Sequence, residues 1–239
     1  MKRICLLTLI ALSLIASQAC AENIVLASGA GYKKMVNALV AEYSRQSGDT
    51  VDKIYGNMAR VTTVAKQGTV HLVLGDAVFL KNANLTLQKN VPLGQGKLVL
   101  AYSPRFTPQA NAPLRDSRIT RVALPDGKKA IYGKAARQYL TRSGSASALK
   151  DKLLEVATVP QVFSYIATDE VDMGFLNLTH ALNVQDKLGG YIVLEQEYYD
   201  PISIVIGVMD IPAPEEKLNA FLTFLTSPEA QTIIRKHGL

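Results

Sequence analysis

Residues 24–46, IVLASGAGYKKMVNALVAEYSRQ, predict a strand, a tight turn and an amphipathic helix, in that order. The first four residues form an apolar, strand-like run, and residues 28–31 are small enough for the backbone to turn sharply. The helical spacing is carried by Met35, Leu39, Val40 and Tyr43. A strand–turn–helix unit of this kind, repeated along a chain, is typical of an α/β fold with largely parallel sheets.

The alternation continues in two groups, separated by the proline-containing segment 103–117, which is predicted to be a loop. The first group has predicted strands at 24–27, 51–55, 71–75 and 97–102 and helices at 32–46, 59–67 and 77–82, with residues 83–96 irregular. The second has predicted strands at 121–124, 153–157, 172–176, 191–196 and 202–209 and helices at 130–141 and 160–167. Two further helices, at 214–225 and 228–237, complete the chain. We therefore expect two α/β lobes, one formed by residues 22–100 with 198–239 and the other by residues 101–197.

The N-terminal residues 1–21 have the three parts of a secretory signal peptide. Lys2 and Arg3 are a short basic region, residues 4–16 are an apolar run, and Ala19-Cys20-Ala21 fits a signal peptidase site. The apolar run is shorter than the roughly 20 residues needed to span a bilayer. We expect an exported protein released into the periplasm, with a lipid-modified Cys20 as the alternative.

The composition of the remaining chain narrows its function. The whole chain has 26 basic and 20 acidic residues, and loss of the signal leaves a net charge of about +4. This charge is spread along the chain without a basic block, which disfavours nucleic acid and suits a small anion. Both cysteines lie in the signal segment, so a mature chain has no disulfide, thiolate metal site or cysteine nucleophile.

Four strand-to-helix turns are the strongest indication of a binding site. They lie at residues 27–32, 56–60, 125–130 and 177–179. Ligands of open α/β sheets bind outside the carboxyl ends of the strands, where all four turns are predicted to lie. A helix N-terminus there offers unpaired N–H groups to an anion. Each turn by itself is equally compatible with an ordinary helix cap, and Lys129 or Arg60 could face either the cleft or solvent.

Catalytic patterns are poorly supported. His71, His180 and His237 have no metal-ligand spacing, and the sequence lacks a Gly-x-Ser-x-Gly elbow, a His-Glu-x-x-His motif and a phosphate-binding loop. The paired Tyr198 and Tyr199 could hold a ferric ion as phenolates, bind an anion as phenols, or simply pack. We expect no enzyme activity and no cofactor, and keep ferric-ion capture and an exported sensor or enzyme as alternatives.

The order of these turns and strands resembles that of the periplasmic molybdate-binding proteins of ABC importers. The resemblance covers nearly the whole mature chain and includes Ala-Ile-Tyr-Gly-Lys-Ala at 130–135, Met-Gly-Phe-Leu at 173–176 and Phe-Leu-Thr-Ser-Pro-Glu-Ala-Gln at 224–231. It implies a two-lobed periplasmic binding protein fold of the type II topology, with the ligand in the inter-lobe cleft. It also implies a monomer that captures molybdate or tungstate and delivers it to an inner-membrane permease.

The resemblance implies ligand-binding positions as well. The family's first serine falls at Gly31 or, with a shifted turn including Gly29 and Ala30, at Ser28. Its second, serine-rich loop falls on Asn57, Met58 and Ala59. The backbone donor of the second lobe falls near Lys129 and Ala130, the strand-end donor at Leu176 or Asn177, and the family tyrosine at Tyr199.

Overall fold

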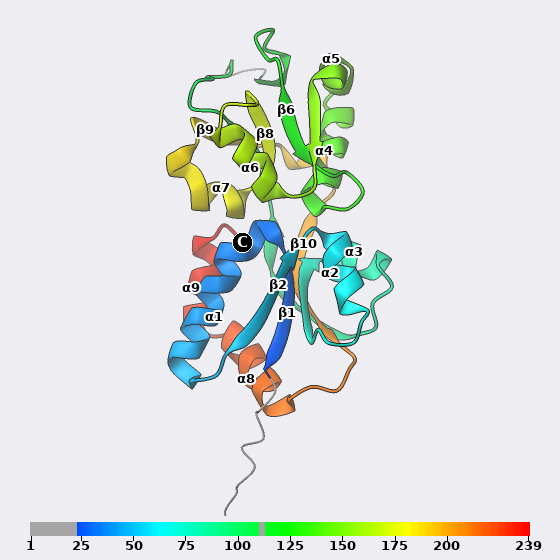
Figure 1. Cartoon of the computed structure of the whole chain (residues 1–239), viewed down its shortest axis with the longest axis vertical. Helices are drawn as coiled ribbons and strands as arrows, with labels where there is room; N and C mark the ends of the chain where they lie inside the picture. The colour runs from blue at the N-terminus through cyan, green and yellow to red at the C-terminus, as the bar shows by residue number, and fades with distance from the viewer. Residues whose placement is uncertain (1–22, 110–112) are drawn as a thin grey trace, which may run out of the picture.

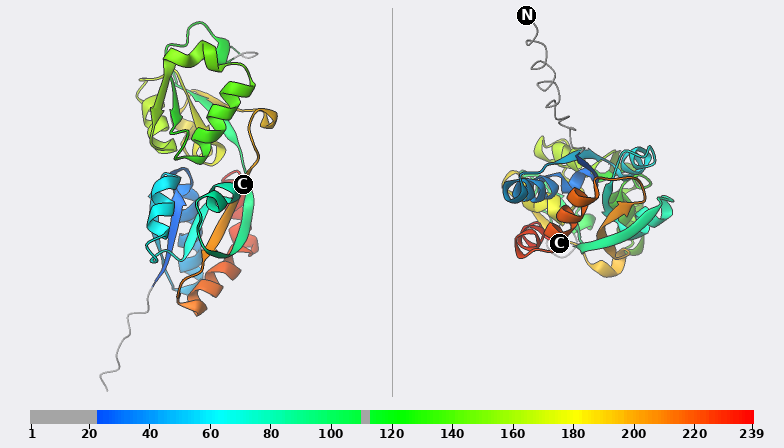
Figure 2. Two further views of the ribbon diagram at one scale, coloured as in Figure 1. Left: turned by 90° about the vertical axis from the view of Figure 1, so that its right-hand side faces the viewer. Right: turned by 90° about the horizontal axis from the view of Figure 1, so that it is seen from below.

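The computed structural model describes residues 23–109 and 113–239 of the chain. These residues form two α/β lobes, stacked one above the other and joined by two extended crossings (Figures 1 and 2). The predicted two-lobed α/β architecture is confirmed. The predicted signal segment and both cysteines lie outside the described residues. Within the described residues, no helix is long and apolar enough to cross a membrane.

The first lobe contains a five-stranded sheet in the order β2-β1-β3-β10-β4. Its strands are β1 Ile24–Gly29, β2 Val51–Gly56, β3 Leu72–Asp76, β4 Leu87–Gly96 and β10 Ile202–Met209. Its helices are η1 Ala30–Tyr32, α1 Lys33–Ser47, α2 Met58–Ala65, α3 Ala77–Asn82, α8 Glu215–Leu225 and α9 Pro228–Lys236. The apolar face predicted for α1 is buried, and Tyr43 packs edge-on against Phe221 with 5.0 Å between the ring centroids.

The second lobe contains a sheet in the order β7-β6-β8-β5-β9. Its strands are β5 Leu98–Tyr102, β6 Val122–Pro125, β7 Leu153–Val156, β8 Met173–Asn177 and β9 Gly190–Val193. Its helices are α4 Ile131–Arg142, α5 Ala146–Leu149, α6 Val159–Ala167 and α7 Leu178–Val184, with short 3-10 turns η2 Pro113–Arg115, η3 Lys150–Lys152, η4 Gln185–Lys187 and η5 Gln196–Tyr198. The central strands β6 and β8 are buried along their whole length, as expected for strands covered on both faces.

The prediction of largely parallel sheets is wrong, because both sheets are mixed. β10 runs antiparallel to β3 and β4, and β5 runs antiparallel to β8 and β9. The cause is the position of the crossings. The first residue of β5, Leu98, pairs with Asn177 at the carboxyl end of β8, so β5 starts at the cleft and must run away from it. In the first lobe, Ile204 near the start of β10 pairs with Asp76 at the carboxyl end of β3. β10 therefore also starts at the cleft and runs away from it.

Residues 83–96, predicted to be irregular, contain the ten-residue strand β4. β4 is the outer strand of its sheet, and its pairing with β10 shifts register between Gly94 and Pro92. An edge strand tolerates a proline and polar side chains, which is why this segment lacks the apolar signature of a strand. The whole of β5 belongs to the second sheet, so the chain crosses at Lys97, before the predicted boundary at residue 100. The loop at 103–117 follows β5 within the second lobe.

The two crossings are fastened to each other. The Leu98 backbone N–H, on the outgoing crossing, donates a hydrogen bond of 3.1 Å to the hydroxyl of Tyr199, on the returning crossing. Tyr199 is buried. Its position makes it part of the hinge between the lobes.

Candidate functional site

Four strand-to-helix turns, two from each lobe, meet at the inter-lobe cleft. β1 leads into η1 and α1, and β2 leads into α2, while β6 leads into α4 and β7 leads into α6. They enclose a cavity of about 30 Å³, which we call the cleft site. It is lined by Gly29, Gly31, Tyr32, Gly56, Asn57, Met58, Ala130, Ile131, Tyr132, Thr158 and Val159. None of these side chains carries a formal charge.

The helix N-termini supply the polarity of the cleft site. The first N–H groups of a helix have no acceptor within that helix and carry its partial positive charge. The Asn57 Oδ1 atom caps α2 by accepting a 3.0 Å hydrogen bond from the Arg60 N–H. At α6, Thr158 and Gln161 form a reciprocal capping box with hydrogen bonds of 3.3 and 3.1 Å. These caps engage the third N–H of each helix. The Ala59 N–H is used at the rim of the cleft and Pro160 has no N–H, so the first N–H group of each helix, that of Met58 and that of Val159, remains for a ligand.

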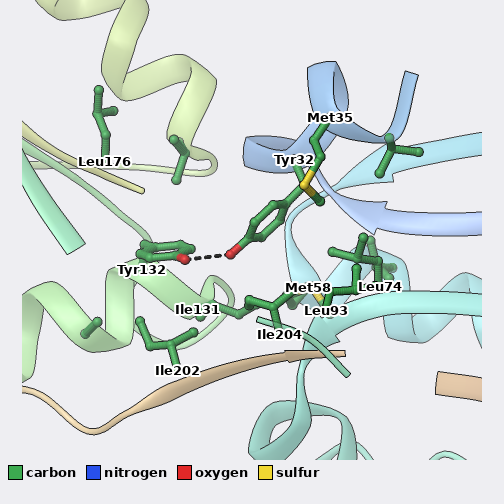
Figure 3. Packing of buried hydrophobic residues seen from close by; sticks show 14 of the residues in the cluster. Tyr32, Met35, Met58, Leu74, Leu93, Ile131, Tyr132, Leu176, Ile202 and Ile204 are labelled. Carbon is green, nitrogen blue, oxygen red and sulfur yellow. Dashed lines mark hydrogen bonds between the residues drawn. The ribbon is translucent and has the colours of Figure 1, made fainter. Parts of the chain in front are cut away.

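A pair of tyrosines joins the lobes beside the cleft site. The hydroxyls of Tyr32, in η1, and Tyr132, in α4, lie 2.5 Å apart and are hydrogen bonded across the gap (Figure 3). Both side chains are buried, and burial raises the pKa of each phenol above its usual value. The two groups are therefore neutral at physiological pH. One hydroxyl donates to the other, which leaves the second hydroxyl proton for another acceptor.

Asn177 leaves no room for a side chain at position 31. The Asn177 Nδ2 atom donates a 3.4 Å hydrogen bond to the Gly31 carbonyl, joining the lobes a second time. A Cβ placed on Gly31 would lie 2.6 Å from Asn177 Oδ1, which is closer than real Cβ contacts allow. That Oδ1 atom is fully buried and has no hydrogen-bond partner in the described chain. A serine at position 31 would therefore clash with this asparagine.

Met58 fills the floor of the cleft site. Its side chain is buried, and a Cβ added to Gly75 would lie 2.6 Å from the Met58 Cε atom. A Cβ on Gly29 would lie 3.5 Å from Sδ. The glycines of β1 and β3 thus make the room that this thioether occupies.

The lobes also contact each other through backbone atoms at the rim. The Ala59 N–H donates a 3.3 Å hydrogen bond to the Lys129 carbonyl, and the Lys34 ammonium donates a 2.5 Å hydrogen bond to the Asn183 carbonyl. The Lys129 ammonium lies 3.5 Å from Asp126, and its side chain is 60% exposed. These contacts describe a closed arrangement of the lobes.

The structure brings together five of the residues predicted for the site. Gly29, Gly31, Asn57, Met58 and Ala130 line the cleft site. Ala59 and Lys129 form the rim contact, and Ala30 lies in η1. Ser28 and Leu176 are buried within β1 and β8, Asn177 lies behind Gly31, and Tyr199 lies at the hinge. Whether each position contacts a ligand stays a prediction.

Six lining residues were not among the predicted positions: Tyr32, Gly56, Ile131, Tyr132, Thr158 and Val159. Residues 158–161, Thr-Val-Pro-Gln, carry a usable signal, because a threonine followed three residues later by glutamine marks a capping box. This helix start follows a strand and is therefore a further turn of the predicted kind, whereas no residue of the predicted turn at 177–179 lines the cleft site. No local pattern pairs Tyr32 with Tyr132, which are 100 residues apart.

The tyrosines considered for ferric-ion binding have different surroundings. Tyr198 packs edge-on against Tyr139, with 5.4 Å between ring centroids, while the Tyr199 hydroxyl accepts the Leu98 N–H. Among the described residues, no group of three or more histidine, cysteine, aspartate or glutamate side chains could hold a metal ion.

Known proteins match the chain along nearly its whole described length. A family model for bacterial extracellular solute-binding proteins matches residues 24–239. The molybdate-binding protein ModA of Rhodobacter capsulatus is 27% identical over 236 residues, covering 94% of this chain and 90% of that protein. ModA of Azotobacter vinelandii is 23% identical, covering 94% and 92%.

Solved structures share the fold. The Azotobacter vinelandii periplasmic molybdate-binding protein superimposes with a TM-score of 0.81 at 22% identity, covering 90% of this chain and 98% of that one. The sulfate-binding protein SubI from Mycobacterium tuberculosis gives a TM-score of 0.72 at 15% identity, with coverages of 90% and 85%. The predicted periplasmic binding protein fold is thereby confirmed. By the match to its model, the chain belongs to the family of bacterial extracellular solute-binding proteins.

Proposed function

We propose that this chain captures a small tetrahedral oxyanion of the molybdate type in the cleft site and delivers it to the membrane permease of an ABC importer. The observation that carries this proposal is the meeting of four helix N-termini, from both lobes, at a cavity without charged side chains. Such a site stabilises an anion through N–H groups and helix dipoles. The names of the two ModA relatives support the same ligand class.

The size of the cleft site favours an inorganic ion over an organic solute. A volume of 30 Å³ accommodates about two or three water molecules, since one needs about 10–15 Å³ of such space. An ion with four oxygen atoms enters when the lobes part about the hinge and is enclosed when they close. The tyrosine pair and the rim contact then form on both sides of it.

The neutral lining also bears on selectivity. Phenols and helix N–H groups donate hydrogen bonds, so the lining suits an ion that only accepts them. A protonated oxyanion needs an acceptor in the wall. Among the described residues, the lining contains no carboxylate, and the side-chain oxygens of Asn57 and Thr158 already accept hydrogen bonds as helix caps. We therefore place molybdate and tungstate ahead of phosphate.

Export is part of the proposal. Removal of residues 1–21 releases a periplasmic protein that acts as a monomer and as a binding protein rather than an enzyme. Mass spectrometry of the mature N-terminus distinguishes a chain starting near Glu22 from one that starts at a lipid-modified Cys20.

The direct test is a calorimetric titration of ligand-free protein with molybdate, tungstate, sulfate and phosphate. We expect binding of the first two and weaker or no binding of phosphate. No heat and no thermal stabilisation with any of the four ions would overturn the proposal.

A pair of variants at Val159 tests the role of the helix N-termini. Proline is tolerated at the first position of a helix because its missing N–H has no helical acceptor, and Thr158 has the extended backbone that a following proline requires. Val159→Pro thus removes one N–H from the cleft site, whereas Val159→Ala keeps it. A hydrogen bond to a charged group contributes about 1.5–3 kcal/mol, so we expect the proline variant to bind roughly tenfold or more weakly than the alanine variant.

A further inference from the structure

A second and larger cavity lies between the lobes, and Ala59 of the rim contact is among its lining residues. Its volume is about 430 Å³, and we call it the hinge cavity. Its walls come from α2 and α3 of the first lobe, α4 of the second lobe and the returning crossing at residues 200–202. Ile131 lines both cavities, whereas Ile202 lines only this one. A volume of this size is in the range of pockets that hold small organic molecules.

The hinge cavity is apolar in part and charged in part. Val78, Phe79, Ile131, Pro201 and Ile202 supply apolar surface. Val78 is 50% exposed, a large fraction for a valine, so the cavity has an apolar rim. Such a wall suits a ligand with a hydrocarbon or aromatic body.

The two carboxylates in the wall already have partners. The Asp76 oxygens accept hydrogen bonds of 2.9 Å from the Phe79 N–H and 3.0 Å from the Ser203 N–H. The Asp200 oxygens accept hydrogen bonds from Arg142 and Gln138, at 2.7 and 2.6 Å. Neither carboxylate needs a cation from a ligand.

The two lysines in the wall, unlike the carboxylates, make no direct hydrogen bond or ion pair with the described residues. Lys128 and Lys134 line the cavity from the turn before α4 and from α4 itself. Within the described chain, neither ammonium has a hydrogen bond or an ion pair within 4 Å, although the charge of Lys134 is close enough to Asp76 and Asp200 to favour their ionised forms. The donor capacity left in this wall is therefore cationic, and it matches an anionic group.

We propose that the hinge cavity binds a small organic anion with an apolar body, separately from the ion in the cleft site. Its anionic group lies at Lys134 and Lys128, and its body lies against Ile202 and Phe79. Because the cavity has walls from both lobes and from the hinge, it is complete only in the closed arrangement.

We expect the two ligands to affect each other's affinity, an expectation that rests on the proposed function. A ligand that completes its contacts only in the closed arrangement shifts the lobes toward closure. The oxyanion and the organic anion should then strengthen each other's binding by the same factor, about fivefold or more, since coupling between two sites is reciprocal.

The test uses naphthalene-1-sulfonate as the anionic probe and naphthalene-1-methanol as its neutral counterpart, each titrated into protein with labelled isoleucine methyl groups. We expect the sulfonate to bind, to shift the Ile202 methyl signal, and to bind more tightly than the alcohol. Lys134→Met should weaken sulfonate binding about threefold to fivefold, as for a partly exposed ion pair. Lys187→Met, at an exposed lysine of η4 away from the cavity, is the matched control and should leave it unchanged.

Three results would overturn the proposal: no shift at Ile202, equal affinity for the alcohol, or equal loss in the two lysine variants. The probe is then titrated again in saturating molybdate. An unchanged probe affinity in protein that binds molybdate contradicts the coupling alone. If molybdate does not bind, the proposed function fails while the probe experiment still decides the hinge cavity.

Discussion

The cleft site and the hinge cavity occupy the same gap between the lobes but are built on different principles. The cleft site is small and uncharged, and it is lined by phenols and helix N-termini. The hinge cavity is more than ten times larger and has lysines and carboxylates in its walls. The difference shows that one gap between two lobes contains both a small uncharged site, of a size for an inorganic ion, and a larger charged one, of a size for an organic solute.

The largest expected effect comes from a substitution that disturbs both the cleft site and the hinge cavity. Gly133 lies in α4, which contributes Tyr132 to the cleft site and Lys134 to the hinge cavity. A Cβ at Gly133 would lie 2.2 Å from the Asp126 carbonyl oxygen, a backbone atom that cannot turn aside. Gly133→Ala should lower the free energy of unfolding by about 3 kcal/mol, measured by urea denaturation, and weaken both ligands. Gly144→Ala, at the open turn after α4, is a control for which strain comes only from the backbone.

A change at Gly31 should break the cleft site while leaving the hinge cavity intact. Gly31→Ser drives a side chain into Asn177, and overpacking of this kind costs about 1–3 kcal/mol. We expect oxyanion affinity to fall by about 10-fold to 100-fold in calorimetry, with probe binding at the hinge cavity measurable. Asn177→Ala in the same chain should restore much of the loss by removing the clash. Failure of the double variant to recover any affinity would argue against this steric explanation.

The tyrosine pair offers a smaller change at the same place. Tyr32→Phe or Tyr132→Phe removes the hydrogen bond between the lobes, for a loss of about 1 kcal/mol and roughly fivefold weaker oxyanion binding. Because both hydroxyls belong to one hydrogen bond, the double variant should lose less than the sum of the two single losses. Strict additivity in this double-mutant cycle would show that the phenols act independently.

The smallest expected effect is a pH dependence of ligand binding that differs between the cleft site and the hinge cavity. The tyrosines keep the cleft lining neutral, because burial raises the pKa of each. In the hinge cavity, burial raises the pKa of the Asp76 carboxyl above its usual value. As the pH falls through that pKa, Asp76 becomes neutral and repels an anion less. Sulfonate affinity should therefore rise about twofold to threefold on acidification, measured by titration across a pH series.

Asp76→Asn is the control for that pH series. Asparagine retains the oxygen that accepts from the Phe79 N–H, loses the acceptor for the Ser203 N–H, and does not titrate. At all pH values, the variant should bind the sulfonate with the higher affinity that the unmodified chain reaches at low pH. A pH dependence that persists in Asp76→Asn would assign it to another group.

The predicted elements and the observed ones differ mainly where a strand lies at the edge of a sheet. Central strands such as β3 and β8 are buried throughout and were predicted from their apolar residues. β4 has only one buried side chain among its residues other than glycine, Leu93, and contains Pro92, so nothing in its local sequence distinguishes it from a loop. Its conformation depends on pairing with β10, more than 100 residues later.

The predicted site and the structural site share the turns but differ in the side chains. Residues 28–31, 57–58 and 130 lie at turns that topology alone brings to one edge. The strand-end donor was predicted at Leu176 or Asn177; the Asn177 side chain donates to the Gly31 carbonyl across the lobes, and its contact with a ligand stays a prediction. Tyr199 was predicted from the resemblance; its hydroxyl accepts a hydrogen bond from the Leu98 N–H between the crossings, and its contact with a ligand stays a prediction.

The sequence by itself determined the alternation of strands and helices, the presence of two lobes and three of the four turns at the cleft site. These features follow from side-chain periodicity and capping, which act over a few residues. Only the tertiary structure decided the strand directions at the crossings, the tyrosine pair, the fit of Asn177 against Gly31 and the presence of two cavities. Those features join residues that are 100 or more positions apart, and such contacts depend on how the lobes close rather than on any local pattern.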